Sequence, residues 1–135
     1  MKVIDWIGAL EQVGGDEDFL IEVLQDLLVE ATAAVEQIQE GINISDFSLV
    51  MHSAHRIKGS ASYLCCDELR EISLQLQDCG RAGMKVAEAK EAEAKEAEAK
   101  EEGGEPAKLW IDIRKKLSRY NEALEALRKE ASSRK

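Results

Sequence analysis

The segment DEDFLIEVLQDLLVEATAAVEQIQEG, residues 16–41, sets the expected architecture of this chain. Its apolar side chains recur every three or four residues, which places them on one face of an α-helix. Asp16 follows the flexible pair Gly14-Gly15 and offers its carboxylate as the helix cap. The predicted buried stripe of this long amphipathic helix consists of Leu20, Val23, Leu24, Leu27, Leu28, Ala31, Val35 and Ile38.

Further helices are predicted on both sides of this segment. Residues 3–10 indicate a short first helix, and Ser45 with Asp46 can cap a third. Asp67 can cap a fourth, and Pro106 suits the first turn of the last. Their inward faces are expected to hold Phe47, Val50, Met51, Ala54, Ile57, Ala61 and Leu64, then Leu69, Ile72, Leu76 and Cys79, then Leu109, Ile113, Leu117, Tyr120, Leu124 and Leu127.

The composition supports an all-α fold. One Pro and 4% aromatic residues in a chain of 135 favour helices over sheets. We therefore expect a single domain over residues 1–135, an antiparallel four-helix bundle with a short additional N-terminal helix and a helical extension. A monomer is expected, because one bundle of this length can bury its own apolar stripes.

The extension is predicted from a repeat. The sequence AEAKE occurs three times in succession within residues 87–101. Ala, Glu and Lys favour helices and no large apolar residue lies among them, so residues 87–102 are expected to form a solvated helical insertion. Gly80 and Gly83 are expected to kink or interrupt the helix before it. A docking arm is one interpretation, and a neutral expansion of a tolerant surface connection is the favoured one.

Charge and hydropathy narrow the possible functions. The chain has 27 acidic and 18 basic residues, a net charge of −9, which is opposite to what nucleic-acid phosphates attract. Residues 1–106 are acidic and residues 107–135 basic, so the two parts should attract each other. No apolar run approaches the roughly 20 residues that cross a bilayer, so no membrane association and a cytoplasmic location are expected.

The run HRIKGSAS, residues 55–62, carries the candidate chemistry. A glycine inside a helix costs about 1 kcal/mol relative to alanine, so Gly59 indicates a steric or packing requirement. His55 is expected to project outward beside this small residue, with the Lys58 ammonium one turn away. The same exposed face is expected to include Ser48, His52, Ser62 and Cys66, a possible partner-docking face. An exposed imidazole beside a cation suits a transient phosphoryl acceptor.

At these residues the chain resembles the histidine-containing phosphotransfer (HPt) family. The family signature is a histidine followed by x-x-Lys-Gly and small residues on a helix of a four-helix bundle, and LQDCGRAG at 76–83 resembles its later L-E-x-x-G-R-x-G. The resemblance implies a phosphorelay intermediate that accepts a phosphoryl group from one receiver-domain aspartate and passes it to another. It implies that His55 is the phosphoacceptor, that Lys58 stabilises the phosphate and that Gly59 provides clearance.

The same resemblance implies a phosphocarrier without catalytic activity of its own. Its partners would be receiver domains of hybrid sensor kinases and response regulators. Mg²⁺ would be bound by the receiver, and this chain would bind no cofactor. One departure is Cys65, which stands where family members usually have Gly and is expected on the core side of its helix. The repeat insertion is a second departure.

The same residues allow other interpretations. His52 and His55 with Cys65 or Cys66 are too widely spaced on a helix to converge on zinc. The three cysteines are better interpreted as reduced thiols in or near the core. Neither glycine pair has the context of a nucleotide-binding loop. A structural adaptor that kept the scaffold and lost the chemistry is the alternative function.

Overall fold

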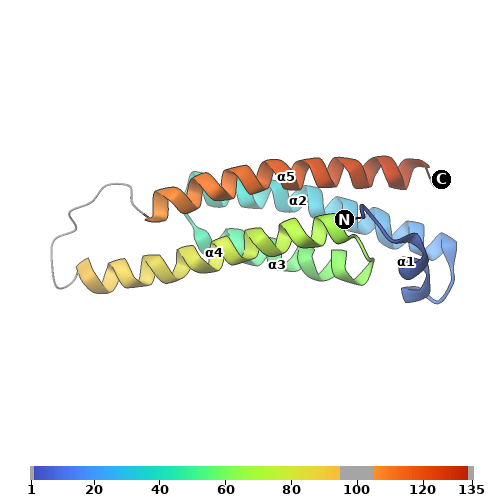
Figure 1. Cartoon of the computed structure of the whole chain (residues 1–135), viewed down its shortest axis with the longest axis horizontal. Helices are drawn as coiled ribbons and strands as arrows, with labels where there is room; N and C mark the ends of the chain where they lie inside the picture. Colours follow the sequence, from blue (N-terminus) through green and yellow to red (C-terminus); the bar gives the residue numbers. More distant parts are fainter. Residues whose placement is uncertain (1, 95–104, 134–135) are drawn as a thin grey trace.

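The computed structural model describes residues 2–94 and 105–133 and contains five helices in those ranges. They are α1 (Trp6–Gln12), α2 (Glu17–Asn43), α3 (Phe47–Tyr63), α4 (Asp67–Ala94) and α5 (Glu105–Ser133). The last four run alternately up and down, and α1 lies across one end of them (Figure 1). The predicted antiparallel four-helix bundle with a short additional N-terminal helix is confirmed.

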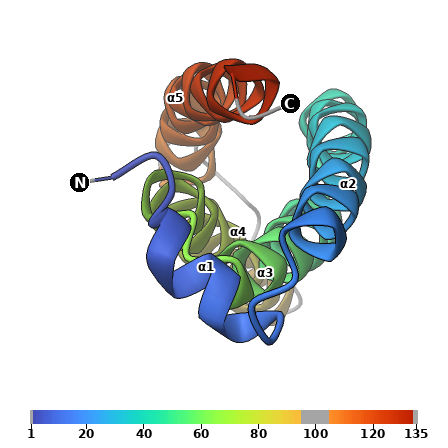
Figure 2. The same cartoon turned by 90° about the vertical axis from the view of Figure 1, so that its right-hand side faces the viewer.

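The helices surround one apolar core (Figure 2). Helix α3 packs against α2 and α4, and α5 closes the bundle against α4 and α2. The predicted inward residues of α4, Leu69, Ile72, Leu76 and Cys79, are all buried. Tyr120 of α5 is also buried, and its hydroxyl donates a 2.8 Å hydrogen bond to the Ala31 carbonyl oxygen of α2.

Aspartates begin three of the helices. The carboxylates of Asp5, Asp16 and Asp46 accept hydrogen bonds from the backbone N–H three residues later, as N-cap side chains do. The predicted caps Asp16 and Asp46 are therefore confirmed. Asp5 explains why α1 begins at Trp6 and not at the first apolar residue. Asp67, predicted as a cap, is instead the first residue of α4.

Three helices end in the same hydrogen-bonded turn. At the end of α3, Cys66 N donates to Ala61 O and Cys65 N donates to Ser62 O, which is the Schellman pattern. This pattern needs a left-handed residue, and Cys65 supplies it with φ 57°. Ser45 (φ 57°) and Gly14 (φ 72°) do the same after α2 and α1.

This turn corrects two predictions about the cysteines. Cys66 was predicted on the exposed face and is fully buried, whereas Cys65, predicted on the core side, is half-buried. The helical geometry used for both predictions ends at Tyr63. The left-handed backbone of Cys65 then redirects the chain and turns the next side chain inward.

The prediction that Gly80 and Gly83 kink or interrupt α4 is wrong, because α4 is continuous from Asp67 to Ala94. Both glycines are contact residues instead. A Cβ at Gly80 would lie 2.8 Å from the Met51 backbone nitrogen, and one at Gly83 would overlap the Phe47 ring. Glycine at both positions lets α4 approach α3 closely.

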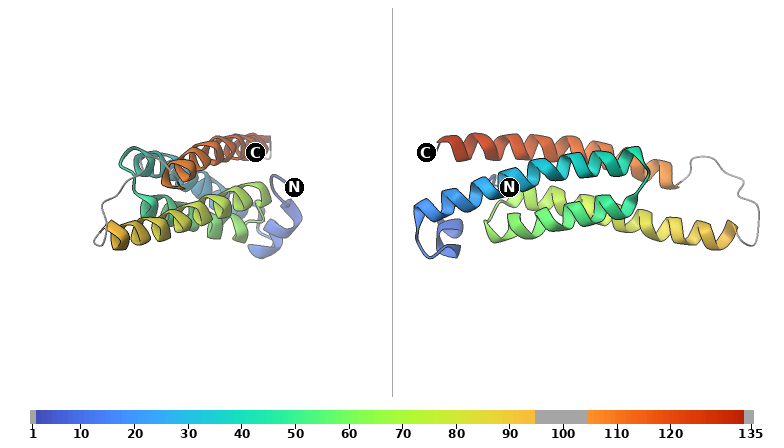
Figure 3. Two further views of the ribbon diagram at one scale, coloured as in Figure 1. Left: turned by 60° about the vertical axis from the view of Figure 1, so that its left-hand side comes forward. Right: turned by 180° about the vertical axis from the view of Figure 1, so that it is seen from behind.

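The fourth helix extends past the beginning of α3 along the bundle axis (Figures 1 and 3). It includes the first AEAKE repeat, whose residues Ala87, Glu88 and Ala89 are exposed. The predicted insertion at 87–102 lies outside the described residues beyond Ala94. In the described ranges, no helix has the combined length and apolar character of a membrane span.

Candidate functional site

Helix α3 presents the candidate site on its outer surface, between α2 and α4 (Figure 2). Asp46 caps its beginning and a buried stripe including Val50, Ala54 and Ile57 fixes its rotation about its own axis. The opposite face must therefore point to solvent. His52, His55, Gly59 and Ser62 are exposed there, whereas Ser48 and Lys58 are partly buried.

His55 is exposed and also held in place. Its Nδ1 lies 3.0 Å from Oε1 of Gln77, a residue of α4 whose side chain is only 4% exposed. A carbonyl oxygen can only accept, so this contact requires the proton on Nδ1. In the neutral imidazole with its proton on Nδ1, the lone pair is on Nε2, which can act as a nucleophile.

Sequence reasoning missed Gln77. It lies within the quoted segment 76–83, but the stretch was interpreted as a family resemblance without a role for this residue. One signal was available. Gln77 is one turn from Ser73 and from Gly80, two small residues typical of a face packed closely against another helix. A large polar side chain on such a face needs a hydrogen-bond partner on the neighbouring helix.

Gly59 has no packing role within the described structure. A Cβ built on it would meet no atom within 4 Å, unlike one on Gly41, Gly80 or Gly83. The cost of a glycine inside α3 is therefore not offset by a close contact inside the protein. The predicted role of Gly59, clearance next to His55, stays a prediction.

Lys58 follows His55 by three residues on α3. In the part of the chain that the structure describes, it forms no ion pair. Its ammonium is thus available to an anion near His55, since residues three apart on a helix are neighbours. The predicted proximity of this ammonium to a phosphate on His55 stays a prediction.

The cysteines do not add to the site. Burial raises the pKa of the Cys66 thiol to about 12, and this thiol faces the Leu64 carbonyl oxygen at 3.6 Å. It therefore stays protonated near neutral pH and is a poor nucleophile. Across residues 2–94 and 105–133, no group of three or more His, Cys, Asp or Glu side chains converges as a metal site would require.

Comparison with known proteins identifies the family. The family model of the Hpt domain matches residues 22–130, a range that contains His55, Lys58, Gly59 and Gln77. No match is found among curated proteins or solved structures. Helical architecture and family match agree, and the match covers most of the sequence. The chain therefore belongs to the Hpt domain family, whose members carry phosphoryl groups in phosphorelay signalling and interact with receiver domains.

Proposed function

We propose that this chain relays a phosphoryl group between two receiver domains through Nε2 of His55. The observation that carries the proposal is the 3.0 Å contact between Nδ1 of this exposed imidazole and the buried Gln77 amide. It holds the ring on the surface and leaves Nε2 as the nucleophilic atom. Family membership supports the same role.

The proposed transfer needs no proton movement on this chain. The Nε2 lone pair attacks the phosphorus of a receiver's aspartyl phosphate, and an N–P bond forms. The bond between phosphorus and the carboxylate oxygen breaks, and its electron pair stays on the aspartate. The imidazole ring gains positive charge, which the Gln77 carbonyl oxygen stabilises through the Nδ1 proton. Transfer to a second receiver reverses these bond changes.

The surroundings of His55 match this chemistry. Lys58 supplies a positive charge for the transferred phosphoryl oxygens, and Gly59 leaves space for the loops of the receiver's active site. Mg²⁺ and the remaining catalytic groups belong to the receiver, because phosphoryl transfer depends mainly on positioning and charge stabilisation. This chain then serves as a phosphocarrier.

The direct test uses purified receiver domains charged with acetyl phosphate and Mg²⁺. Mixing them with this chain should produce acid-labile, base-stable phosphate on it, and mass spectrometry should locate the label at His55. A second receiver should then remove the label. Labelling at another residue, or no labelling by any receiver of the same organism, would contradict the proposal.

Gln77→Leu should lower the transfer rate about fivefold, because one orienting hydrogen bond is worth about 1 kcal/mol. We expect the maximal transfer rate to fall and the receiver concentration needed for half-saturation to stay the same. The ¹⁵N chemical shifts of the imidazole should show less of the Nδ1-protonated tautomer. Gln75→Leu is the matched control, since Gln75 is on the same helix and contacts Glu71 instead. An unchanged tautomer ratio in Gln77→Leu would remove Gln77 from the mechanism.

Gly59→Arg should lower transfer from a receiver by about 100-fold or more, because the side chain displaces the partner's reacting atoms. Helicity should be unchanged, since no described residue has an atom within 4 Å of a Cβ there and Arg favours helices. Phosphoramidate, a small phosphodonor, should still label His55, which separates steric exclusion from damage to the imidazole. Wild-type transfer from the receiver in this variant would disprove the clearance role.

A further inference from the structure

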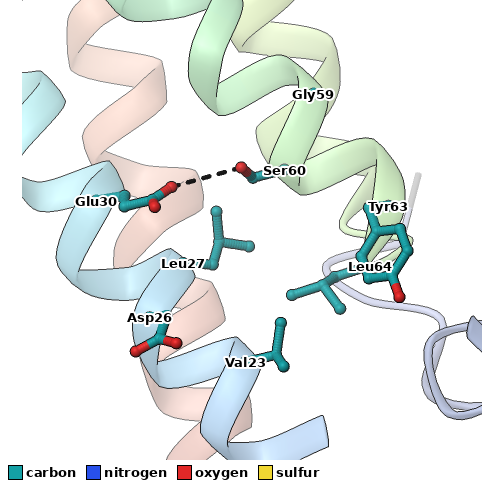
Figure 4. Close-up of a pocket in the computed structure, with 8 residues that line it drawn as sticks. All are labelled: Val23, Asp26, Leu27, Glu30, Gly59, Ser60, Tyr63 and Leu64. Carbon is teal, nitrogen blue, oxygen red and sulfur yellow. Dashed lines mark hydrogen bonds between the residues drawn. The ribbon is translucent and has the colours of Figure 1, made fainter. Parts of the chain in front are cut away.

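A groove of about 400 Å³ lies between α2 and α3, beside the candidate site (Figure 4). Val23 and Leu27 of α2 line it from one side, and Tyr63 and Leu64 line it from the other. Tyr63 is 47% exposed, and so is Phe19, one turn before Val23. Large exposed apolar side chains around a hollow are typical of a protein-docking surface.

The groove is continuous with the surroundings of His55. Gly59 lines the groove and lies four residues after His55, so it faces the same side of α3. Ser60, the next residue, spans the groove and donates a 3.4 Å hydrogen bond to Glu30 (Figure 4). A partner that reaches His55 across Gly59 therefore also covers this groove.

The rim of the groove is negatively charged. Asp26 and Glu30 line it from α2, and both are exposed. Helix α2 has seven Asp or Glu residues and no Lys or Arg. Within the described ranges, neither carboxylate pairs with a basic side chain. Two like charges four residues apart repel each other, so a positively charged group of a partner would be stabilised beside them.

We propose that the receiver domain that exchanges a phosphoryl group with His55 inserts an apolar side chain flanked by Lys or Arg into this groove. The inference rests on the proposed function and adds to it the chemistry that selects the partner. An apolar floor with an acidic rim fits such a side chain by both packing and charge. A second copy of the chain fits poorly, because a two-fold contact would bring the carboxylates of both grooves together.

The test removes the charges of the two rim side chains and keeps the size of those side chains. Asp26→Asn with Glu30→Gln should lower the rate of transfer from a subsaturating phosphorylated receiver by about tenfold at low salt. Raising the ionic strength should slow the wild-type chain and reduce the difference, because salt screens exposed charges. The receiver used is the one that labels wild-type His55 fastest in a panel charged with acetyl phosphate.

Two controls separate docking from chemistry. Glu36→Gln with Glu125→Gln removes the same charge at a separate groove, which Glu36 of α2 and Glu125 of α5 line. This variant should transfer at the wild-type rate. Phosphoramidate needs no docking, so it should label His55 equally in all three proteins.

Each outcome has a defined meaning. Equal receiver transfer by the rim variant and the wild-type chain would overturn the groove assignment and leave the proposed function intact. The same loss in both double variants would also overturn it, since only overall charge would then matter. If no receiver labels the wild-type chain, the proposed function fails and the groove assignment fails with it. A salt-dependent loss confined to the rim variant supports the proposal.

Discussion

His55→Gln is expected to abolish transfer of phosphate from a charged receiver to this chain, down to the background of the assay. Glutamine retains a polar side chain of similar reach but has no nucleophilic ring nitrogen. The measurement is acid-labile radioactive phosphate on the chain after mixing with a phosphorylated receiver and Mg²⁺. Phosphoramidate labelling should disappear as well, because it depends on the same Nε2 atom.

His52→Gln is the matched control for this prediction. His52 is exposed on the same helix, three residues before His55, and no Lys-Gly pair follows it at the same spacing. The His52→Gln variant should carry as much phosphate as the wild-type chain. His52 lies at the surface, so the free energy of unfolding of His52→Gln should stay within about 0.5 kcal/mol of wild type. His55→Gln also loses the contact with buried Gln77 and should lose about 1 kcal/mol. Phosphate that persists in His55→Gln and disappears in His52→Gln would move the acceptor to the other histidine.

The second large effect is on stability, at Gly83. Gly83→Ala should lower the free energy of unfolding by about 2–3 kcal/mol, because the new methyl group overlaps the Phe47 ring in a packed interface. The ring cannot move aside freely. It stacks on Trp110 of α5, with centroids 4.0 Å apart and an interplanar angle of 13°. Urea unfolding monitored by circular dichroism measures the change.

Gly59→Ala provides the comparison at a glycine on the neighbouring helix. A Cβ at this position would meet no atom of residues 2–94 or 105–133 within 4 Å, so alanine should raise the free energy of unfolding by about 0.5–1 kcal/mol through helix propensity alone. Opposite signs for the two glycine-to-alanine changes are expected. A destabilised Gly59→Ala variant would show that the glycine has a packing role inside the protein, and a stable Gly83→Ala variant would show that α3 and α4 separate easily.

Much of the fold follows from local features of the sequence. Apolar spacing predicted the long helices, and Asp16 and Asp46 predicted where two of them begin, because a cap acts on its own first turn. The prediction for Gly80 and Gly83 was wrong because the role of these residues depends on a neighbouring helix and not on local sequence. A glycine inside a helical pattern can mark a break or a close contact, and only the position of the neighbouring helix distinguishes the two.

The candidate site also has one part that local sequence predicts and one part that it does not. The exposure of His55 and Gly59 depends on helix rotation, which the apolar stripe of α3 already determines. The contact with Gln77 joins residues 22 positions apart on two helices, so their axial register sets it and no local pattern encodes it. The prediction that Cys66 is exposed was wrong because the helical projection was continued past Tyr63, the last residue of α3.

The left-handed turn at Cys65 has a practical consequence for spectroscopy. Glycine adopts that backbone conformation without strain, so Cys65→Gly should be tolerated and would leave Cys66 and Cys79, both buried, as the remaining thiols. A single cysteine introduced at exposed Ser62 would then be the accessible attachment point for a fluorophore or spin label. Such a probe would report receiver binding from the surface that the phosphorylated partner approaches.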